Sequence, residues 1–455
     1  MKPEKVSQSP VVKFGEPQRE VREIFKAFTE NATVHGLKYT TPESGRGIAR
    51  RIVWTLAFLA TVGCLIYTVS IQVVELRNRP TLTQVSVEFK EQMLFPAVTL
   101  CSLNKARKSA LPEGIEDAIK MVLLRKSSLA YTLNQTEFMS NFEIMEEDFE
   151  YVAHGIFPTL QSCSWDNIQQ NCTDLFLTVK TDMGYCFSFN HRSSNADPRI
   201  SKRTGNKYGL TVIANIQQDE YLVDSNTESA GLRVLLHGYN ETPLVESRGF
   251  DVAPGKATKV SLDMMTVKNL PPPYTTLDGS TCMEMSNGES PKTLALFEEY
   301  DLNACRFECR HDYIFSECQC RTSYDPDKFM AENGYKNCSC LPPCEWSMYT
   351  PRVSMGDYPS LALMDMIDNE ESESNFTQTQ YRQNFLKLTI TFDQFLLETV
   401  KQVPKFSSES IVSTLGGQMG MFLGASLLSA VEFLDFLLQL VLTKIRKRST
   451  TSPEK

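Results

Sequence analysis

An uncharged, glycine-rich stretch near the end of the chain carries the residue types best suited to ion chemistry. Residues 411–431 contain no charged side chain, and about 20 such residues suffice to cross the apolar core of a bilayer. Glycine is unfavourable inside a helix, and acids in a membrane segment are rare and usually face water. Both nevertheless occur between residues 411 and 442, as Gly416, Gly417, Gly420, Gly424, Glu432 and Asp435. Anchoring alone does not account for this composition.

On a continuous helix, many of these residues would share one face, because they recur at spacings of three and four. The stripe consists of Ser413, Gly417, Gly420, Gly424, Leu428, Val431 and Asp435, with Glu432 beside it. Several copies around an axis would expose backbone carbonyls and acidic side chains, the groups that line cation-selective pores. Gly424-Ala425-Ser426 can also break the helix, since unwound backbone is tolerated where it lines a water-filled cavity.

Helix packing is the alternative explanation for the glycines. Gly416, Gly420 and Gly424 form two overlapping small-xxx-small repeats, a pattern that lets two membrane helices approach closely. Packing does not require Glu432 or Asp435, however. These two acids favour a pore over a simple anchor.

A second uncharged block, residues 52–74, must help to position the first. Basic residues flank the pair on their outer sides: Arg46, Arg50 and Arg51, then Lys444, Arg446, Lys447 and Arg448. The positive-inside rule therefore predicts a multi-pass protein of the cell membrane with both termini in the cytoplasm. The predicted segments are a cytoplasmic 1–51, a first span 52–75, an extracellular domain 76–410, a pore-lining span 411–442 and a disordered cytoplasmic tail 443–455. The net charge of −9 argues against a nucleic-acid partner.

The cysteines agree with this topology. Of 13 cysteines, Cys64 lies in the first span and all the others lie between the spans, as expected for disulfides in an oxidising compartment. Candidate glycosylation sequons fall in the same region, at Asn134, Asn171, Asn240, Asn337 and Asn375. We therefore predict an α+β fold in which two transmembrane helices flank a large, disulfide-rich extracellular domain with a β-sheet core and peripheral helices.

Residues 282–344 hold a dense cysteine series. Its members are Cys282, Cys305, Cys309, Cys318, Cys320, Cys338, Cys340 and Cys344. Cys305 and Cys309 would share a helix face, and Cys338 and Cys340 a strand face, which predicts a ladder of disulfides between a helix and a strand. Zinc is the alternative, but it needs thiolates that stay reduced. Spacing alone does not decide the pairing.

Local patterns predict further elements. Residues 21–30 read as a short amphipathic helix before the first span. Residues 208–216, 231–237 and 385–394 alternate and are rich in β-branched side chains, which is typical of strands. The proline-rich residues 271–274 are predicted to be extended, because proline fixes φ.

Several motifs, in order along the chain, resemble those of one known family. They are His35-Gly36, residues 95–101, 217–221, 249–255 and 271–274, the cysteines from 305 to 344, and residues 415–420 followed by Gly424-Ala425-Ser426. This series resembles the degenerin/epithelial sodium channel family, and most closely its acid-sensing ion channel branch with that branch's peptide-gated relatives. The likeness covers residues 20 to 445.

The resemblance implies a homotrimer, or a heterotrimer with related subunits, whose second spans line a sodium-selective, amiloride-sensitive pore. If the family's functional positions are transferred to the matching residues of this sequence, Gly424, Ala425 and Ser426 would be the selectivity filter. Gly417 and Gly420 would lie at the outer mouth, where blockers bind, and Glu432 and Asp435 near the inner mouth. The gating residues would be His35, Gly36 and Ser413. Apart from the permeant sodium ion, no cofactor is implied.

The resemblance also implies a disulfide pattern. The pairs would be Cys101–Cys186, Cys163–Cys172, Cys282–Cys344, Cys305–Cys340 and Cys309–Cys338. Cys318 and Cys320 depart from the pattern, because the loop that would hold their partners is short and contains no cysteine. They are left to pair with each other, to pair between subunits, or to stay free.

Two differences between this sequence and the acid-sensing members bear on the stimulus that would open the channel. The shortened loop removes acids from an intersubunit pocket, and no histidine follows the first span where acid-sensing members carry several. Histidine is the natural sensor between pH 5 and 8, although shifted carboxylates also titrate there. We therefore predict gating by an extracellular neuropeptide, with gating by protons as the alternative.

Two other classes of function are weaker. An enzyme is disfavoured, because the sequence has no nucleophile elbow, phosphate loop or metal-binding histidine set. A two-span adhesion or structural protein would not need glycines and acids in its second span. Within the channel class, a subunit that conducts only with partners is a third possibility.

Overall fold

The computed structural model describes residues 16–40, 47–111, 150–194, 196–222, 228–276, 279–285, 292–295, 297, 300–318, 338–370 and 377–450. The chain divides into two compact units. The first comprises Met1–Leu82 and Pro404–Lys455, and the second comprises Thr83–Val403. We describe each unit by itself.

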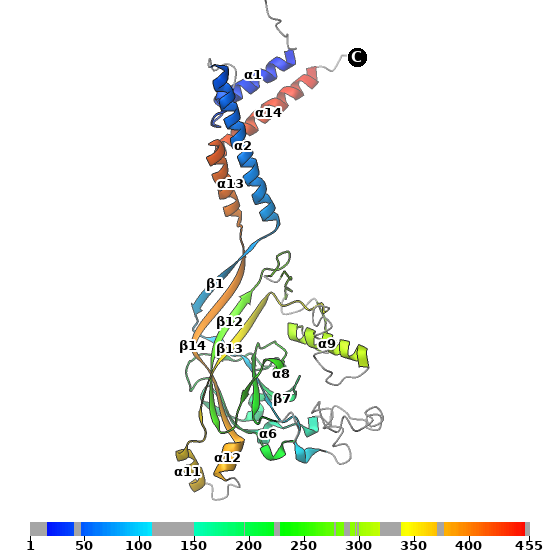
Figure 1. The fold of residues 1–455 in the computed structure, drawn as a ribbon, viewed down its shortest axis with the longest axis vertical. Helices are drawn as coiled ribbons and strands as arrows, with labels where there is room; N and C mark the ends of the chain where they lie inside the picture. Colours follow the sequence, from blue (N-terminus) through cyan, green and yellow to red (C-terminus); the bar gives the residue numbers. More distant parts are fainter. Residues whose placement is uncertain are drawn as a thin grey trace, which may run out of the picture. The chain divides into compact units, whose positions relative to one another are not determined.

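The first unit is helical (Figure 1). Its elements are α1 (Glu16–Asn31), a 3₁₀ turn η1 (Leu37–Tyr39), α2 (Ile48–Arg77), α13 (Ser408–Leu423) and α14 (Leu427–Thr450). By length and composition, α2 is the one described helix that is able to cross a membrane unaided. α13 and α14 meet the same criterion only as a pair, bent by 79° at the break between them.

The described residues of the second unit form two larger β-sheets and one small one. The first of the larger sheets has the strand order β13-β12-β14-β9-β4-β5, and β1 also pairs with β14. Its strands are β1 (Thr81–Phe89), β4 (Leu160–Trp165), β5 (Ile168–Gln170), β9 (Leu210–Asn215), β12 (Lys256–Lys268), β13 (Glu345–Asp357) and β14 (Phe385–Pro404). β12 and β14 run parallel, whereas β13 is antiparallel to β12 and β9 is antiparallel to β14.

The second sheet has the order β11-β10-β3-β7-β6, and β2 pairs with β8 separately. The strands are β2 (Met93–Leu94), β3 (Ala97–Ser102), β6 (Phe176–Thr181), β7 (Gly184–Phe189), β8 (Ile200–Ser201), β10 (Leu232–His237) and β11 (Phe250–Val252). Peripheral elements are η2 (Lys108–Ala110), α6 (Ile156–Thr159), α7 (Cys172–Leu175), η5 (Gln218–Glu220), α8 (Val245–Arg248), α9 (Leu302–Cys318), α11 (Leu361–Glu370) and α12 (Gln378–Asn384).

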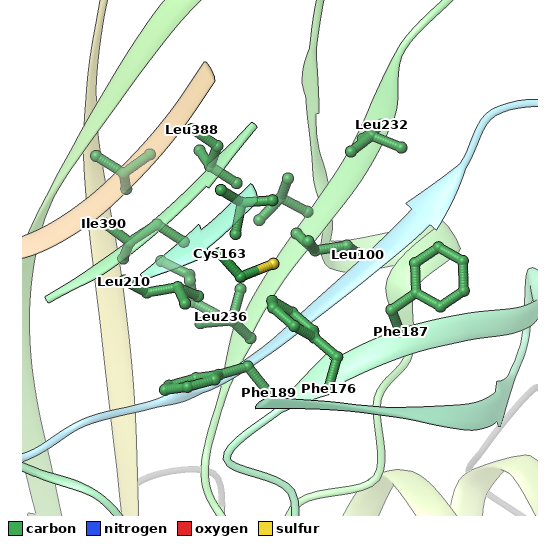
Figure 2. Packing of buried hydrophobic residues seen from close by; sticks show 14 of the residues in the cluster. Leu100, Cys163, Phe176, Phe187, Phe189, Leu210, Leu232, Leu236, Leu388 and Ile390 are labelled. Atoms are coloured by element: carbon green, nitrogen blue, oxygen red, sulfur yellow. The ribbon is translucent and has the colours of Figure 1, made fainter. Parts of the chain in front are cut away.

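The core of the second unit lies between the two larger sheets (Figure 2). Alternate residues of β14 turn inward, so that Leu386, Leu388 and Ile390 are almost completely buried. Phe95 makes edge-to-face contacts with Phe189 and Phe392, each with ring centroids 5.9 Å apart. Burying one such side chain contributes roughly 1.5–3 kcal/mol, so this cluster is the main source of stability in the unit.

Several local expectations need correction. The helix predicted at 21–30 is longer and begins at Glu16. Residues 271–274 form a turn instead of an extended segment, because the Tyr274 N–H donates to the Pro271 carbonyl at 3.2 Å. The tail after residue 443, predicted to be disordered, continues α14 as far as Thr450. The strands expected around residues 208–216, 231–237 and 385–394 are present as β9, β10 and β14.

Gly231, which precedes β10, provides a test of the packing between β10 and the edge strand β11. Its φ is +149°, and a Cβ there would overlap the carbonyl oxygen of Val252 on β11. Gly231→Ala is expected to lower the free energy of unfolding by about 1–3 kcal/mol, the usual cost of such backbone strain. Chemical denaturation of the purified full-length chain would measure this.

Gly356 on β13 is the matched control, because a Cβ there would meet nothing within 4 Å. Gly356→Ala is expected to change the unfolding free energy by no more than about 0.5 kcal/mol. Equal effects of the two substitutions would contradict the overlap at Gly231.

Candidate functional site: the helix break and the His-Gly turn

The predicted pore segment is not one continuous helix. α13 ends at Leu423, and Gly424 adopts the left-handed conformation with φ 60° and ψ 22°. The Gly424 N–H still donates to the Gly420 carbonyl at 2.9 Å, and the Ala425 N–H donates to the Met419 carbonyl at 3.3 Å. Glycine enters this backbone region without the steric cost of a Cβ. The continuous stripe from Ser413 to Asp435 is therefore wrong, and the alternative expectation, a helix break at Gly424-Ala425-Ser426, is the arrangement present.

The side chain of Ser429 stabilises the start of α14, the helix that follows the break. The Ser426 N–H donates to the Ser429 side-chain oxygen at 3.0 Å, which satisfies a backbone donor that has no partner within α14. Ser429 is buried, as is Ala425 in the break itself. The break is thus a hydrogen-bonded structure and not a frayed end.

The His-Gly turn between α1 and α2 lies directly against this break. The backbone N–H of His35 donates to the Leu423 carbonyl at 3.0 Å. A Cβ on Gly424 would overlap the His35 imidazole, so the close approach of the turn requires glycine at position 424. Gly36 has a φ of +90°, and a Cβ there would lie 3.8 Å from the Trp54 ring. Two motifs nearly 400 residues apart in sequence therefore form one site.

Thr33 joins the same turn to α14. Its hydroxyl lies 2.5 Å from the Ser429 hydroxyl, and its N–H and hydroxyl lie 3.0 and 3.1 Å from one carboxylate oxygen of Glu432. Sequence reasoning singled out Glu432 but missed Thr33 and Ser429. The available signal was a hydroxyl residue two positions before His35 and another three positions before the acid.

Aromatic rings join α1 to α14. Phe28 stacks on Phe436 with centroids 4.5 Å apart, and Phe25 meets the same ring edge-on at 6.3 Å. Aromatic pairs of this kind contribute about 0.5–1.5 kcal/mol beyond their buried area. Sequence reasoning saw an amphipathic helix but not what it packs against.

The other predicted pore residues are distributed over both helices. Ser413, Gly417 and Gly420 lie on α13, and a Cβ on Gly417 would meet nothing within 4 Å. Asp435 lies on α14, where it accepts a hydrogen bond of 2.7 Å from Gln439. Gln418 of α13 lies 3.5 Å from Thr68 of α2. The glycines of α13 thus leave an open helix face in the described part of the chain.

Among its described residues, the second unit has five disulfides: Cys101–Cys186, Cys163–Cys172, Cys282–Cys344, Cys305–Cys340 and Cys309–Cys338. These are the same pairs that the family resemblance implies. Cys305 and Cys309 lie on α9, but the expected strand at Cys338 and Cys340 is wrong, because these residues follow an irregular path. Within the described ranges, no group of three or more His, Cys, Asp or Glu residues is arranged to hold a metal ion.

Some predicted positions lie outside the described residues. These are Cys320, Asn134, Asn337 and Asn375, and Cys318 is the last described residue of α9. The remaining sequon asparagines, Asn171 and Asn240, are exposed.

Three histidines of the second unit are buried, and burial lowers the pKa of each. The pKa falls to about 4 for His191 and to about 3 for His237, and it is also lowered for His154. The His237 ring nitrogens lie 2.9 Å from the Thr99 hydroxyl and 3.0 Å from the Gly238 carbonyl. These two bonds suit the neutral ring, with its proton on Nδ1. Both His191 and His237 therefore stay uncharged through the mildly acidic range.

Comparison with known proteins adds an independent line of evidence. The family model described as amiloride-sensitive sodium channel matches residues 28–436. The chain belongs to this family. Its members are ion channels and not enzymes, and the matched residues include both the His-Gly turn and the helix break.

Acid-sensing ion channels are among this chain's relatives. Acid-sensing ion channel 4-B of Danio rerio is 29% identical over 457 residues, covering 94% of this chain and 78% of the relative. Acid-sensing ion channel 2 of Rattus norvegicus is 28% identical, covering 92% and 86%. Acid-sensing ion channel 1 of Gallus gallus is 27% identical, covering 93% and 85%. A solved proton-activated chloride channel has a TM-score of 0.34 at 7% identity, which is too low to support any inference.

An engineered disulfide would test whether the His-Gly turn lies in contact with the start of α14. Thr33→Cys with Ser429→Cys, in a Cys64→Ser background, is expected to crosslink within the chain on mild oxidation, because the two hydroxyls lie 2.5 Å apart. Adding Gly424→Ala should reduce the yield several-fold, since the new Cβ would displace His35. Mass spectrometry of the linked peptide would measure the yield.

The control for this trapping is Gly63→Ala on α2, where a Cβ meets nothing within 4 Å. It is expected to leave the crosslinking yield unchanged. An undiminished yield in the Gly424→Ala protein would contradict the close approach of His35.

The buried His237 predicts acid-dependent stability. In the unfolded chain this histidine binds a proton near its ordinary pKa of about 6.5, whereas in the fold it does so only at about 3. The unfolded state therefore binds more protons between these values, and stability is lost as the pH falls through this window. His237→Gln should reduce the acid-dependent loss by up to about 1.4 kcal/mol per pH unit. Denaturation of the full-length chain at pH 7, 6 and 5 would measure this, and parallel profiles would contradict it.

Proposed function

We propose that this chain is a subunit of a ligand-gated, amiloride-sensitive, sodium-selective cation channel that is opened by an extracellular neuropeptide. The observation that carries the proposal is the helix break at Gly424, held by the His-Gly turn. A broken helix turns backbone carbonyls away from the helix axis, and carbonyl rings are one way to replace the hydration shell of a cation. Membership of a sodium channel family supports the same chemistry.

In this proposal three subunits, identical or related, surround the pore. Residues 52–75 and 411–442 cross the cell membrane, residues 76–410 are extracellular, and 1–51 and 443–455 are cytoplasmic. The apolar composition of α2, and of α13 with α14 as a bent pair, supports two crossings. The disulfides of the second unit support an oxidising, extracellular location.

The site residues take the following roles. Gly424, Ala425 and Ser426 form the selectivity filter, and Gly417 and Gly420 of α13 form the wider blocker site. Glu432 and Asp435 attract cations to the inner end of the pore, as acidic side chains do in other pores. His35 and Gly36 transmit gating movements to the filter through the His35–Leu423 hydrogen bond, and Ser413 keeps the outer face of α13 free of bulk.

The charge state of the buried histidines favours gating by a peptide. His191 and His237 have pKa values of about 4 and about 3, so neither gains a proton between pH 7 and 5. Proton gating is the second candidate, because the relatives named above are acid-sensing ion channels. In that case shifted carboxylates are the sensors; burial raises the pKa of Asp182, for example.

Whole-cell recording from the chain expressed alone would test the proposal. A panel of amidated neuropeptides at constant neutral pH is expected to evoke an inward sodium current that amiloride blocks. Acid steps from pH 7.4 to 5 are expected to evoke a current at least about tenfold smaller. Current on acid steps alone would move the trigger to protons.

A pore variant separates loss of conduction from loss of expression. Gly424→Arg is expected to abolish the current while surface labelling persists, because the side chain would fill the break. An unchanged current would refute the filter assignment. Silence of the wild type to both stimuli, reversed by coexpression with a related subunit, would identify an obligate heteromer.

A further inference from the structure

The His-Gly turn contacts α2 as well as the helix break. Its second half is a compact 3₁₀ turn, in which the Tyr39 N–H donates to the Gly36 carbonyl and the Thr40 N–H donates to the Leu37 carbonyl, each at 3.1 Å. The Thr40 hydroxyl also donates to the Leu37 carbonyl, at 2.7 Å. Because these bonds fix the backbone that directly follows His35, a contact that holds this half of the turn also fixes where His35 lies.

An aromatic pair attaches the turn to α2. The Tyr39 and Trp54 rings lie with their centroids 4.8 Å apart and their planes at 38° to each other. Trp54 and Phe58 share one face of α2, because residues four apart on a helix are neighbours. Gly36 lies against the same face, since a Cβ there would stand 3.8 Å from the Trp54 ring and 3.9 Å from the Phe58 ring. The turn therefore packs on an aromatic face of α2.

Anchoring at the membrane surface is the simpler explanation for Trp54. Trp and Tyr are enriched where membrane helices meet water, and Trp54 lies in the second turn of α2, shortly after Arg51. An anchor of this kind needs no contact within its own chain. Trp54 is nevertheless half-buried, whereas Tyr67 on the same helix has 68% of its surface exposed. Contact with the turn, in addition to anchoring, thus accounts for the surroundings of Trp54.

α2 contacts both the turn and the helix that precedes the break. It is a continuous helix of 30 residues, and its Thr68 lies 3.5 Å from Gln418 of α13. Thr68 and Trp54 are about four helical turns apart along α2. The helices α13 and α14, by contrast, are bent by 79° at the break. One continuous helix therefore offers a common support for α13 and, through Tyr39, for the turn that packs against the break.

We propose that Tyr39 and Trp54 form an aromatic clamp that positions the helix break against α2, and that this clamp determines how strictly the channel prefers sodium to potassium. The inference rests on the proposed function, because it takes the break to be the selectivity filter. Loss of the clamp would free the turn and, with it, the His35 N–H that binds the Leu423 carbonyl. A carbonyl that is free to move adapts to a larger ion, so potassium would be excluded less strictly. Tyr39 is a positioning residue in this scheme and touches no ion.

Reversal potentials in mixed sodium and potassium solutions would test the clamp, with the stimulus that opens the wild-type channel. In Tyr39→Ala, the sodium-to-potassium permeability ratio is expected to fall by about two- to tenfold, the factor that corresponds to the contribution of one aromatic pair. Tyr39→Phe keeps the ring and should retain the wild-type ratio. Trp54→Ala should lower the ratio to a similar extent, and the double alanine variant should lower it no further, because both substitutions remove one contact.

Tyr67→Ala is the matched control, because it removes a tyrosine of α2 that is largely exposed. It is expected to leave the permeability ratio unchanged. Surface labelling would be measured for every variant. If Tyr39→Ala does not reach the surface, Tyr39→Leu takes its place, since leucine keeps apolar bulk at position 39 without the ring.

A second measurement of the clamp does not depend on conduction. Thr33→Cys with Ser429→Cys, in the Cys64→Ser background, reports the contact between the turn and the start of α14. Adding Tyr39→Ala is expected to slow crosslinking on mild oxidation by at least about twofold, because the turn loses its aromatic attachment to α2. Adding Tyr39→Phe should leave the crosslinking rate unchanged.

The outcomes separate the clamp from the proposed function. A sodium-selective wild type whose permeability ratio is unchanged by Tyr39→Ala would overturn the clamp and leave the proposed filter intact. A wild type that conducts without preferring sodium would overturn the proposed function, and the crosslinking rate would then decide about the clamp. The crosslinking rate also decides if the wild type gives no current when expressed alone. An equal rate with and without Tyr39→Ala would overturn the clamp in every case.

Discussion

The helical unit depends on how the backbone is satisfied where its second long helix breaks. A helix end leaves carbonyl and N–H groups without intrahelical partners, and in an apolar environment each such group is costly. Here the Leu423 carbonyl accepts the His35 N–H, and the Ser426 N–H finds the Ser429 side chain. The His-Gly turn therefore supplies the hydrogen-bond donor that the end of α13 needs. The close approach of this turn, for its part, requires a residue without a side chain at position 424.

This mutual requirement explains why two short motifs occur in one chain. Thr33 adds a polar connection to Glu432, and the Phe28–Phe436 stack adds an apolar one. An ordinary membrane anchor needs none of these contacts. Backbone carbonyls that must stay in fixed positions need such contacts, and this is the physical argument for the selectivity filter that we propose at the break.

The second unit uses a different source of rigidity. Its two larger sheets enclose an aromatic and aliphatic core, and disulfides fix the outer elements, including α9 through Cys305 and Cys309. Within this frame, His191 and His237 are buried, and burial lowers the pKa of each. His237 is held by the Thr99 hydroxyl and the Gly238 carbonyl in an arrangement that suits its neutral ring. A proton on His237 would therefore destabilise the fold around it.

The sequence by itself determined the composition of each segment: the uncharged blocks, the oxidised cysteines, the alternating strands β9, β10 and β14, and the Gly-Ala-Ser motif. These follow from local rules, because apolar length, side-chain alternation and glycine content act over a few residues. Only the tertiary structure decided that the second helix breaks at Gly424 and that His35 and Thr33 contact the break. It also decided that residues 271–274 form a turn and that the His237 ring is buried against Thr99. Each of these outcomes depends on which groups meet across long stretches of chain, and no local pattern encodes the partner of a backbone N–H or a buried ring.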